Sequence, residues 1–210
     1  MALAMSLPLS AYGQPSSGSQ GGMLDNSSVG IMAGLHFGTI NIEGDSADFL
    51  DTSFLTGLSL GAFTRLPMPA PFSMQIALQY IEKGSVIDPD TVFIDPLEFH
   101  LAYLELPVLV RYDIPAGTSR LQPYFYGGAT LAVLVSAKAV ANGDEDDIKD
   151  ELEDLDFSLA VGAGFVLGDF GRVSLFADLR YTHGLVNISN DPDADPVENR
   201  GISFMLGAQL

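Results

Sequence analysis

FSMQIALQYIEK, residues 72–83, alternates large apolar side chains with small or polar ones. The even positions from Phe72 to Tyr80 are apolar with an aromatic residue at each end, and the odd positions include Gln75 and Gln79. A period of two places the two sets on opposite faces of a strand, whereas a helix would mix them. Strands that face lipid on one side and a narrow polar lumen on the other have this pattern. We therefore predict a membrane-facing strand here.

The same alternation recurs along the chain and predicts eight strands. Their ranges are 29–40, 54–66, 72–83, 98–112, 121–137, 157–168, 172–186 and 200–210. Short connections, such as PMPAP at 67–71, alternate with long ones, such as 138–156. The predicted fold class is therefore all-β: an eight-stranded antiparallel up-and-down transmembrane β-barrel, with long acidic loops at one rim and short turns at the other.

Composition supports a division between an apolar wall and a charged rim. The chain has a net charge of −18, yet 47% of its residues are hydrophobic. Twenty-one of the 27 acidic residues lie in or beside the four long connections. So acidic a chain is unsuited to binding nucleic acid. The absence of cysteine excludes a disulfide scaffold, thiolate metal sites and a cysteine nucleophile.

A soluble eight-stranded barrel or sandwich would also alternate. It would have to expose the polar face, which here consists largely of Gly, Ala, Ser and Thr with few Lys or Glu, a poor surface for solubility. If the strand crosses a membrane, Phe72 and Tyr80 are separated by about 20 Å along the membrane normal. This spacing suits two aromatic girdles, one at each membrane surface. The pattern favours the membrane barrel.

The N-terminal region differs from the rest in composition. Residues 1–13 begin with an apolar core and have small residues at Ala11 and Gly13, as a signal peptide or its remnant would. Residues 14–28 are rich in Ser and Gly and are expected to form a flexible linker. The predicted barrel domain then spans 29–210, with both of its ends on the periplasmic side of a bacterial outer membrane.

Four segments carry a resemblance to a known family. They are YLELPVLVRYDIP (103–115), LQPYFYGGATLAVLVSA (121–137), DFSLAVGAGFVL (156–167) and LFADLRYTHGLVNI (175–188). Together they resemble the PorT-like small outer-membrane β-barrel family. The resemblance implies an integral envelope protein, in some members linked to protein secretion, and it implies no chemistry and no cofactor.

The last predicted strand, RGISFMLGAQL (200–210), resembles a signal for the barrel-assembly machinery. Phe204, Leu206, Ala208 and Leu210 share one face of it. The expected partners are therefore outer-membrane lipids, that machinery, and an envelope or secretion protein.

The inward faces predict a polar plug in the lumen. The residues assigned to it are Glu105, Asp178, Arg180, Arg111, Arg65, Gln75 and Gln79. An eight-stranded barrel is only wide enough for side chains to fill, so buried charges must pair. We expect Glu105 or Asp178 to pair with Arg180 or Arg111. A path for protons or a small solute is the alternative use of these residues.

The third and fourth long connections hold the candidate surface for a cation or a partner. Its residues are Asp144, Glu145, Asp146, Asp147, Asp191, Asp193 and Asp195. Ile148, Leu152 and Leu155 have the spacing of a short amphipathic helix. A solvated surface loop is the favoured explanation of these acids, and an adaptation to a salt-rich habitat is a further one. The alternating acids at 191–195 lack the glycine and distal Glu of an EF-hand, which makes them a weak calcium motif.

Catalysis has little support in the sequence. His36, His100 and His183 lie on separate predicted strands, and no motif joins a serine and an acid to His183. Glycines at 127–128 and at 162 and 164 lie within strands, where they indicate close packing. The leading function is a non-enzymatic structural, adhesive or envelope-assembly role through the loops. A narrow pore or carrier comes second, and a lipid-modifying enzyme with His183 comes third.

Overall fold

The computed structural model describes residues 27–42, 50–89, 97–115, 121–189 and 196–210. The elements, in chain order, are β1 (Ser28–Ile42), β2 (Leu50–Pro67), β3 (Phe72–Pro89), β4 (Leu97–Asp113), β5 (Gln122–Ala141), β6 (Asp144–Asp147), the 3₁₀ turn η2 (Lys149–Glu151), β7 (Leu155–Phe170), β8 (Val173–Gly184) and β9 (Val197–Gln209). Residues 1–26, which include the expected signal segment and most of the expected linker, lie outside this described part of the chain.

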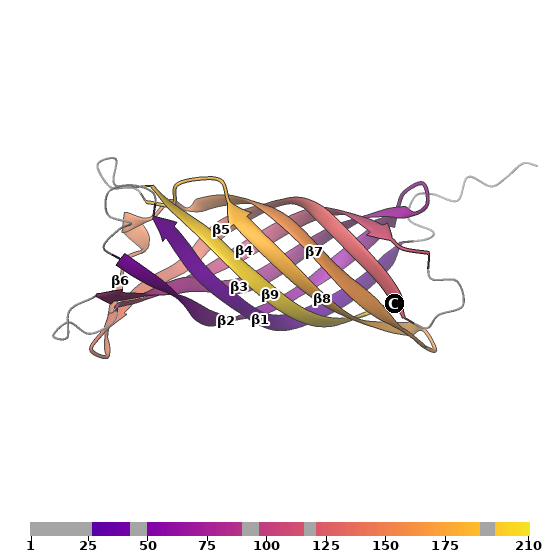
Figure 1. Ribbon diagram of the computed structural model, residues 1–210, viewed down its shortest axis with the longest axis horizontal. Helices are drawn as coiled ribbons and strands as arrows, with labels where there is room; N and C mark the ends of the chain where they lie inside the picture. Colours follow the sequence, from indigo (N-terminus) through magenta and orange to yellow (C-terminus); the bar gives the residue numbers. More distant parts are fainter. Residues whose placement is uncertain (1–26, 43–49, 90–96, 116–120, 190–195) are drawn as a thin grey trace, which may run out of the picture.

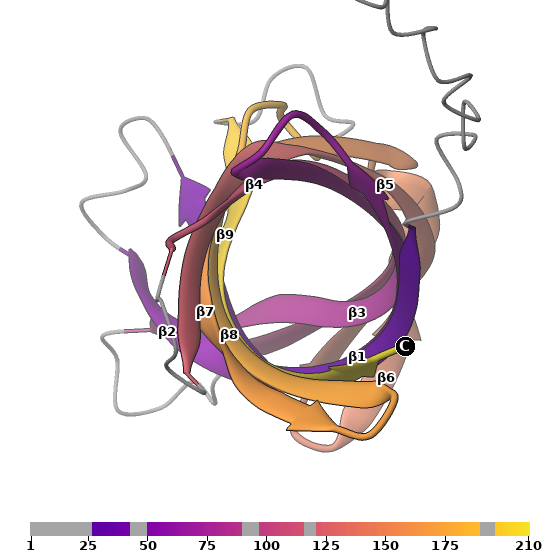
Figure 2. The same ribbon diagram turned by 90° about the vertical axis from the view of Figure 1, so that its right-hand side faces the viewer.

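Eight antiparallel strands form a closed barrel in which each strand pairs with its neighbours in the chain. The order β4-β3-β2-β1-β9-β8-β7-β5 is closed by pairing between β4 and β5. The first and last strands also pair, from Gly30 opposite Gln209 to Ile42 opposite Val197. Figure 1 shows the strands inclined to the long axis, and Figure 2 shows the closed ring seen from one end. The predicted all-β, eight-stranded antiparallel barrel is confirmed.

The two ends of the barrel differ. At one end, here called the turn end, lie the connections 68–71 and 171–172 together with Ser28 and Leu210. Leu210 N–H donates to the carbonyl of Val29 there, at 2.8 Å. The opposite, loop end carries β6 and η2.

Strand faces follow the predicted period of two. In β4, Leu104, Leu106, Val108 and Val110 are 40–45% exposed, while the intervening residues from Tyr103 to Arg111 are buried. The same alternation holds in β3, β7 and β8. The exposed apolar side chains thus form a continuous outer wall, which is the arrangement that a hydrocarbon environment selects. Among the described residues, no helix has the length and apolarity needed to cross a membrane.

An aromatic cluster lies on the outer wall near the turn end. The rings of Phe72 and Tyr112 meet edge to face with centroids 5.3 Å apart, and Tyr112 stacks on Phe125 at 4.9 Å. These residues come from β3, β4 and β5, so the cluster spans three neighbouring strands. Aromatic side chains in this position suit the boundary between hydrocarbon and headgroups.

The strands extend further toward the loop end than the sequence pattern predicted. β3 runs to Pro89 and β5 to Ala141, so parts of the predicted loops 84–97 and 138–156 are strand. The amphipathic helix expected after Asp144 is wrong: residues 144–147 form β6, which pairs back onto β5, and only the 3₁₀ turn follows. The edge of β5 offers the hydrogen bonds that a helix would otherwise supply internally.

Aromatic rings inside the barrel lie over glycines of the adjacent strand. A Cβ on Gly164 would meet the Tyr124 ring, and one on Gly162 would meet the Tyr126 ring. Phe176 covers Gly207 in the same way, and Phe63 covers Gly30. These glycines give the rings room to lie flat against the wall, so the lumen can hold more aromatic volume than its diameter suggests.

We predict that Gly164→Val destabilises the barrel by roughly 1–3 kcal/mol, because the added methyl groups displace the Tyr124 ring and overpack the lumen. Ala163→Val is the matched control, since Ala163 faces outward on the same strand. Urea unfolding in lipid vesicles, followed by the heat-modifiable shift in gel mobility, measures the difference. Equal stability of the two variants would contradict the close packing of ring on glycine.

Candidate functional site

The lumen contains a buried ion cluster toward the loop end. Lys83 Nζ lies 2.8 Å from Glu105 Oε1 and 3.1 Å from Asp156 Oδ2. Asn199 Nδ2 donates to the same Asp156 oxygen at 2.9 Å and to the Tyr103 hydroxyl at 3.2 Å. All five side chains are at most 4% exposed, and they come from β3, β4, β7 and β9. The cluster therefore joins opposite walls of the barrel.

A second network occupies the middle of the lumen and is centred on the Tyr126 hydroxyl. That hydroxyl accepts a hydrogen bond from Arg180 Nε at 3.2 Å and donates to Asp178 Oδ1 at 3.2 Å. Arg180 Nη1 donates to the Gln79 side-chain oxygen at 3.1 Å, and Gln79 Nε2 donates to Ser59 Oγ at 2.6 Å. The phenol thus links the buried arginine to the buried carboxylate without direct contact between them.

The third part of the network lies toward the turn end. The Arg111 guanidinium lies over the Tyr124 ring at 3.4 Å, and the Tyr124 hydroxyl donates to Asp178 Oδ2 at 3.3 Å. Arg111 Nε also donates to Asp113 at 2.8 Å. Arg65 Nη2 reaches the Gln75 side-chain oxygen at 3.4 Å. A guanidinium stacked on a tyrosine ring therefore occupies the lumen near this end.

The seven plug residues expected from the sequence all lie on the inner face, and six of them are buried; Arg65 is half-buried. The expected pairing was wrong in its partners. In the described part of the chain, the cation in contact with Glu105 is Lys83, and Asp178 is linked to Arg180 through Tyr126. The reason is geometric: alternation assigns a residue to a face, while strand stagger decides what lies across the lumen.

Of the five members of the ion cluster, the sequence analysis assigned only Glu105 to the plug, and it missed the two other charged members, Lys83 and Asp156. Lys83 has the same parity as Gln75 and Gln79, so continuing the alternation by two steps would have placed it inside. The sequence pattern assigns Asp156 to the third long connection, but it lies on β7 and is fully buried. Its parity with Ser158 and Ala160, both of which face the lumen, was the available signal.

Several buried polar atoms of the lumen have no hydrogen-bond partner within the described residues. Among them are His36 Nε2, Thr130 Oγ1, Arg180 Nη2 and Asn199 Oδ1. The other His36 nitrogen, Nδ1, lies 2.9 Å from Ser203 Oγ. Buried polar groups of this kind are usually satisfied by internal water. The lumen is thus tightly filled, with a few polar positions suited to single water molecules.

An apolar cluster closes the lumen at the loop end. Its buried members are Ile81, Leu101, Tyr103, Ala132, Leu134, Ala137 and Ile188. Ile148 and Leu152 pack against this cluster from the segment after β6. Backbone hydrogen bonds hold the segment down: Ile148 N–H donates to Ala137, and Glu153 N–H donates to Ile188. The third loop therefore folds over the barrel mouth as a fixed cover.

Acidic side chains are displayed on the outside of this cover. Asp144 to Asp147 form β6 and are all exposed. Lys138 Nζ contacts Glu145 at 2.7 Å, and this hydrogen bond and charge lower the pKa of the Glu145 carboxyl below its usual value. Asp191, Asp193 and Asp195, the other part of the expected acidic surface, lie outside the described residues.

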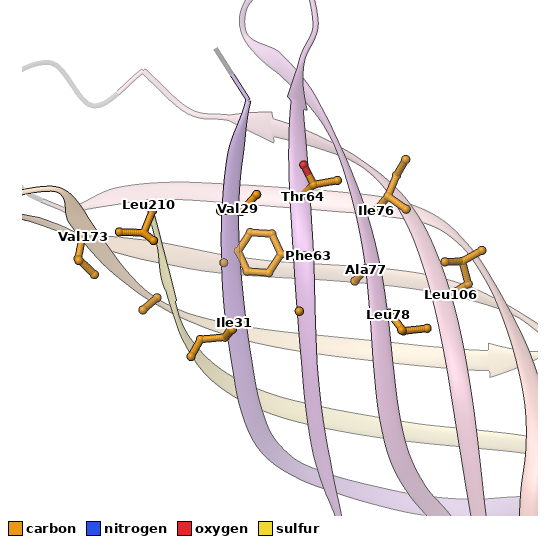
Figure 3. Close-up of a pocket in the computed structure, with 13 residues that line it drawn as sticks. Val29, Ile31, Phe63, Thr64, Ile76, Ala77, Leu78, Leu106, Val173 and Leu210 are labelled. Carbon is orange, nitrogen blue, oxygen red and sulfur yellow. The ribbon is translucent and has the colours of Figure 1, made fainter. Parts of the chain in front are cut away.

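The outer wall also has a broad apolar depression of about 680 Å³ near the turn end (Figure 3). Val29, Ile31 and Leu210 lie along one side of it, and Leu78 and Leu106 lie along the other. Its position on the lipid-facing wall means that hydrocarbon chains of the membrane fill it.

The histidines do not form a catalytic group among the described residues. His183 stacks on Tyr181 with ring centroids 6.3 Å apart, His100 contacts Glu98 at 3.0 Å, and His36 is enclosed in the lumen. No group of three or more potential metal ligands is present in the described segments.

Comparison with known proteins gives a family and a fold. Residues 13–190 match the family model described as outer membrane protein beta-barrel domain. The crystal structure of the outer membrane protein OprG from Pseudomonas aeruginosa is similar with a TM-score of 0.54 and 12% identity, covering 88% of this chain and 96% of that one. No curated protein sequence matches the chain.

Two further solved structures are also similar. Neisserial surface protein A gives a TM-score of 0.49 at 14% identity, with 87% of this chain and 96% of that chain covered. The attachment invasion locus protein Ail of Yersinia pestis gives 0.44 at 14% identity, with 88% and 99% covered.

We predict that Lys83→Met costs roughly 3–5 kcal/mol of unfolding free energy, because it leaves two buried carboxylates without a cation. The double variant Lys83→Met/Glu105→Gln should lose less than the single variant. Lys138→Met, which breaks the exposed pair with Glu145, is the matched control and should cause no measurable loss. Urea titration in vesicles gives all three values. A Lys83→Met loss no larger than that of Lys138→Met would refute the role of the cluster.

Proposed function

Because the chain belongs to the outer membrane protein β-barrel domain family, we propose that this small outer-membrane barrel is a closed anchor that presents its loop end. Its role is structural, adhesive or in envelope assembly. The observation that supports this best is the filled lumen, in which Lys83, Glu105, Arg180 and Tyr126 are each at most 6% exposed. A barrel filled in this way holds its shape without offering a wide passage.

The proposed orientation has the turn end and both barrel termini in the periplasm. The short turns at one end and the longer connections at the other support this orientation. In outer-membrane barrels the short turns face the periplasm and the longer loops face the cell exterior. On β9, Phe204 and Leu206 face outward as the assembly signal would require. The PorT-like resemblance adds an envelope or secretion protein as the kind of partner.

The proposed contact surface is the acidic β6 hairpin. Four consecutive exposed carboxylates project from a hairpin that is hydrogen-bonded to β5 and backed by the cover at Ile148. A rigid display of negative charge suits a partner with a basic surface, since complementary charge steers association.

A narrow path for protons or a very small solute is the second candidate. The unpartnered polar atoms of His36, Thr130 and Arg180 support it, because water molecules bound there would be spaced through the lumen. The apolar cluster around Ile188 opposes it, since that cluster closes the loop end.

We predict no stepwise conductance for the wild-type protein in planar bilayers at 1 M KCl. Replacing both Tyr126 and Arg180 with Gly removes the centre of the plug and should create measurable channels if the barrel still folds. The double substitution Leu179→Gly/Phe125→Gly, on the outer wall, is the control for general weakening. Discrete wild-type channels would favour the pore over the closed anchor.

We predict that amide substitution of Asp144, Glu145, Asp146 and Asp147 weakens binding to a polylysine-coated sensor by about tenfold at low salt, because clustered charges act together. Amide substitution of Asp150, Glu151, Glu153 and Asp154 removes the same charge from the same connection and should have a smaller effect. Binding should fall at high salt through screening. Equal losses for the two sets would show that net charge, and not the hairpin, controls binding.

A further inference from the structure

We propose that the loop end holds a binding pocket for one small, uncharged, apolar molecule, about the size of a substituted benzene ring. The pocket has a volume of about 220 Å³. Its lining residues are Ile40, Ile87, Phe99, Leu101, Leu152, Ile188, Ser189 and Val197. It is separate from the acidic hairpin and from the polar lumen.

The pocket is built from hydrogen-bonded elements. Ile40 is on β1, Ile87 on β3 and Phe99 on β4, and these strands are held by the barrel ladders. The remaining wall is pinned as well: Leu152 forms a β-bridge with Ser189, and Ile188 N–H donates to the Val197 carbonyl at 2.9 Å. A cavity framed in this way is largely preformed, as small-molecule sites usually are.

Its floor is closed. Leu101 and Ile188 belong to the apolar cluster that also contains Ile81 and Tyr103. Beneath that cluster, Tyr103 contacts Asn199 in the buried ion network. A molecule that enters from the loop end would therefore stop here, so the geometry suits binding and not passage.

The chemistry of the lining selects an uncharged apolar ligand. Among the described residues that line it, Ser189 is the only one with a polar side chain, and none is charged. An ion would lose its hydration without gaining a partner, which is costly. The acidic residues of the mouth, such as Glu98 and Glu153, also repel anions.

The volume indicates the size of the ligand. Apolar cavities of about 150 Å³ stay dry and bind benzene. The present pocket is somewhat larger, so toluene or a short-chain hydrocarbon fits it. The depression in Figure 3 is larger still, but it lies on the outer wall, where membrane lipid is already the solvent. The loop-end pocket differs because it lies on the inner side of the barrel mouth.

The test uses isoleucine methyl groups as reporters and toluene as the probe. The full chain, with ¹³C-labelled isoleucine methyl groups, is placed in lipid nanodiscs and titrated with toluene. Saturable shifts are expected at Ile40, Ile87 and Ile188. Ile76 and Ile202 face the lipid and report simple partitioning of toluene into the membrane. Shifts that grow in proportion at all five methyl groups, without saturation, would overturn the proposal.

The second test uses a variant in which a larger side chain fills the pocket. Ile87→Trp places an indole in the cavity and should weaken toluene binding by about tenfold or more, since the apolar contact area is already taken. Ile202→Trp, on the outer wall, should leave binding unchanged. If Ile87→Trp fails to fold by gel mobility, Leu152→Phe takes its place. Unchanged affinity in the filled variant, or equal binding of benzoate, would contradict the proposed site.

Discussion

The constraint on which this structure depends is that every backbone polar group within the hydrocarbon must be paired inside the protein. An open sheet would leave one edge of β1 and one edge of β9 unpaired. Pairing of these two strands over the whole span from Gly30 to Ile42 removes both edges. Closure with eight strands then fixes the barrel diameter, and the diameter fixes how much side-chain volume the interior can hold.

The filled lumen follows from that diameter. Large rings fit only because glycines on the next strand give them space, as Gly162 and Gly164 do for Tyr126 and Tyr124. Buried charges are tolerated where they have partners, as Lys83 has in Glu105 and Asp156. The rings pack along neighbouring strands and the Lys83–Asp156 contact joins opposite walls, so the plug also stabilises the barrel shape.

Alternation in the sequence was sufficient to predict the fold and the two faces of each strand, because its period is a local property of the chain. It could not predict which residues meet across the lumen, because stagger and tilt are properties of the closed sheet. Hence Glu105 was assigned correctly to the interior but to the wrong partner. The strand ends were also missed, because pairing between β3 and β4 continues to Ile87 opposite Leu97, beyond the apolar stretch.

The loop end was the least predictable part, and the reason is physical. A run of acids such as Asp144–Asp156 reads as one solvated segment, but tertiary contacts divide it into three parts with different environments. β6 is exposed, Leu152 packs on the apolar cluster, and Asp156 is buried beside Lys83. The membrane imposes no common pattern here, so this short segment can display charge, cover the barrel mouth and contribute Leu152 to an apolar pocket. Contact with lipid requires apolar residues on the outer wall. The features specific to this barrel therefore lie at the loop end, where the chain leaves the membrane and that requirement no longer applies.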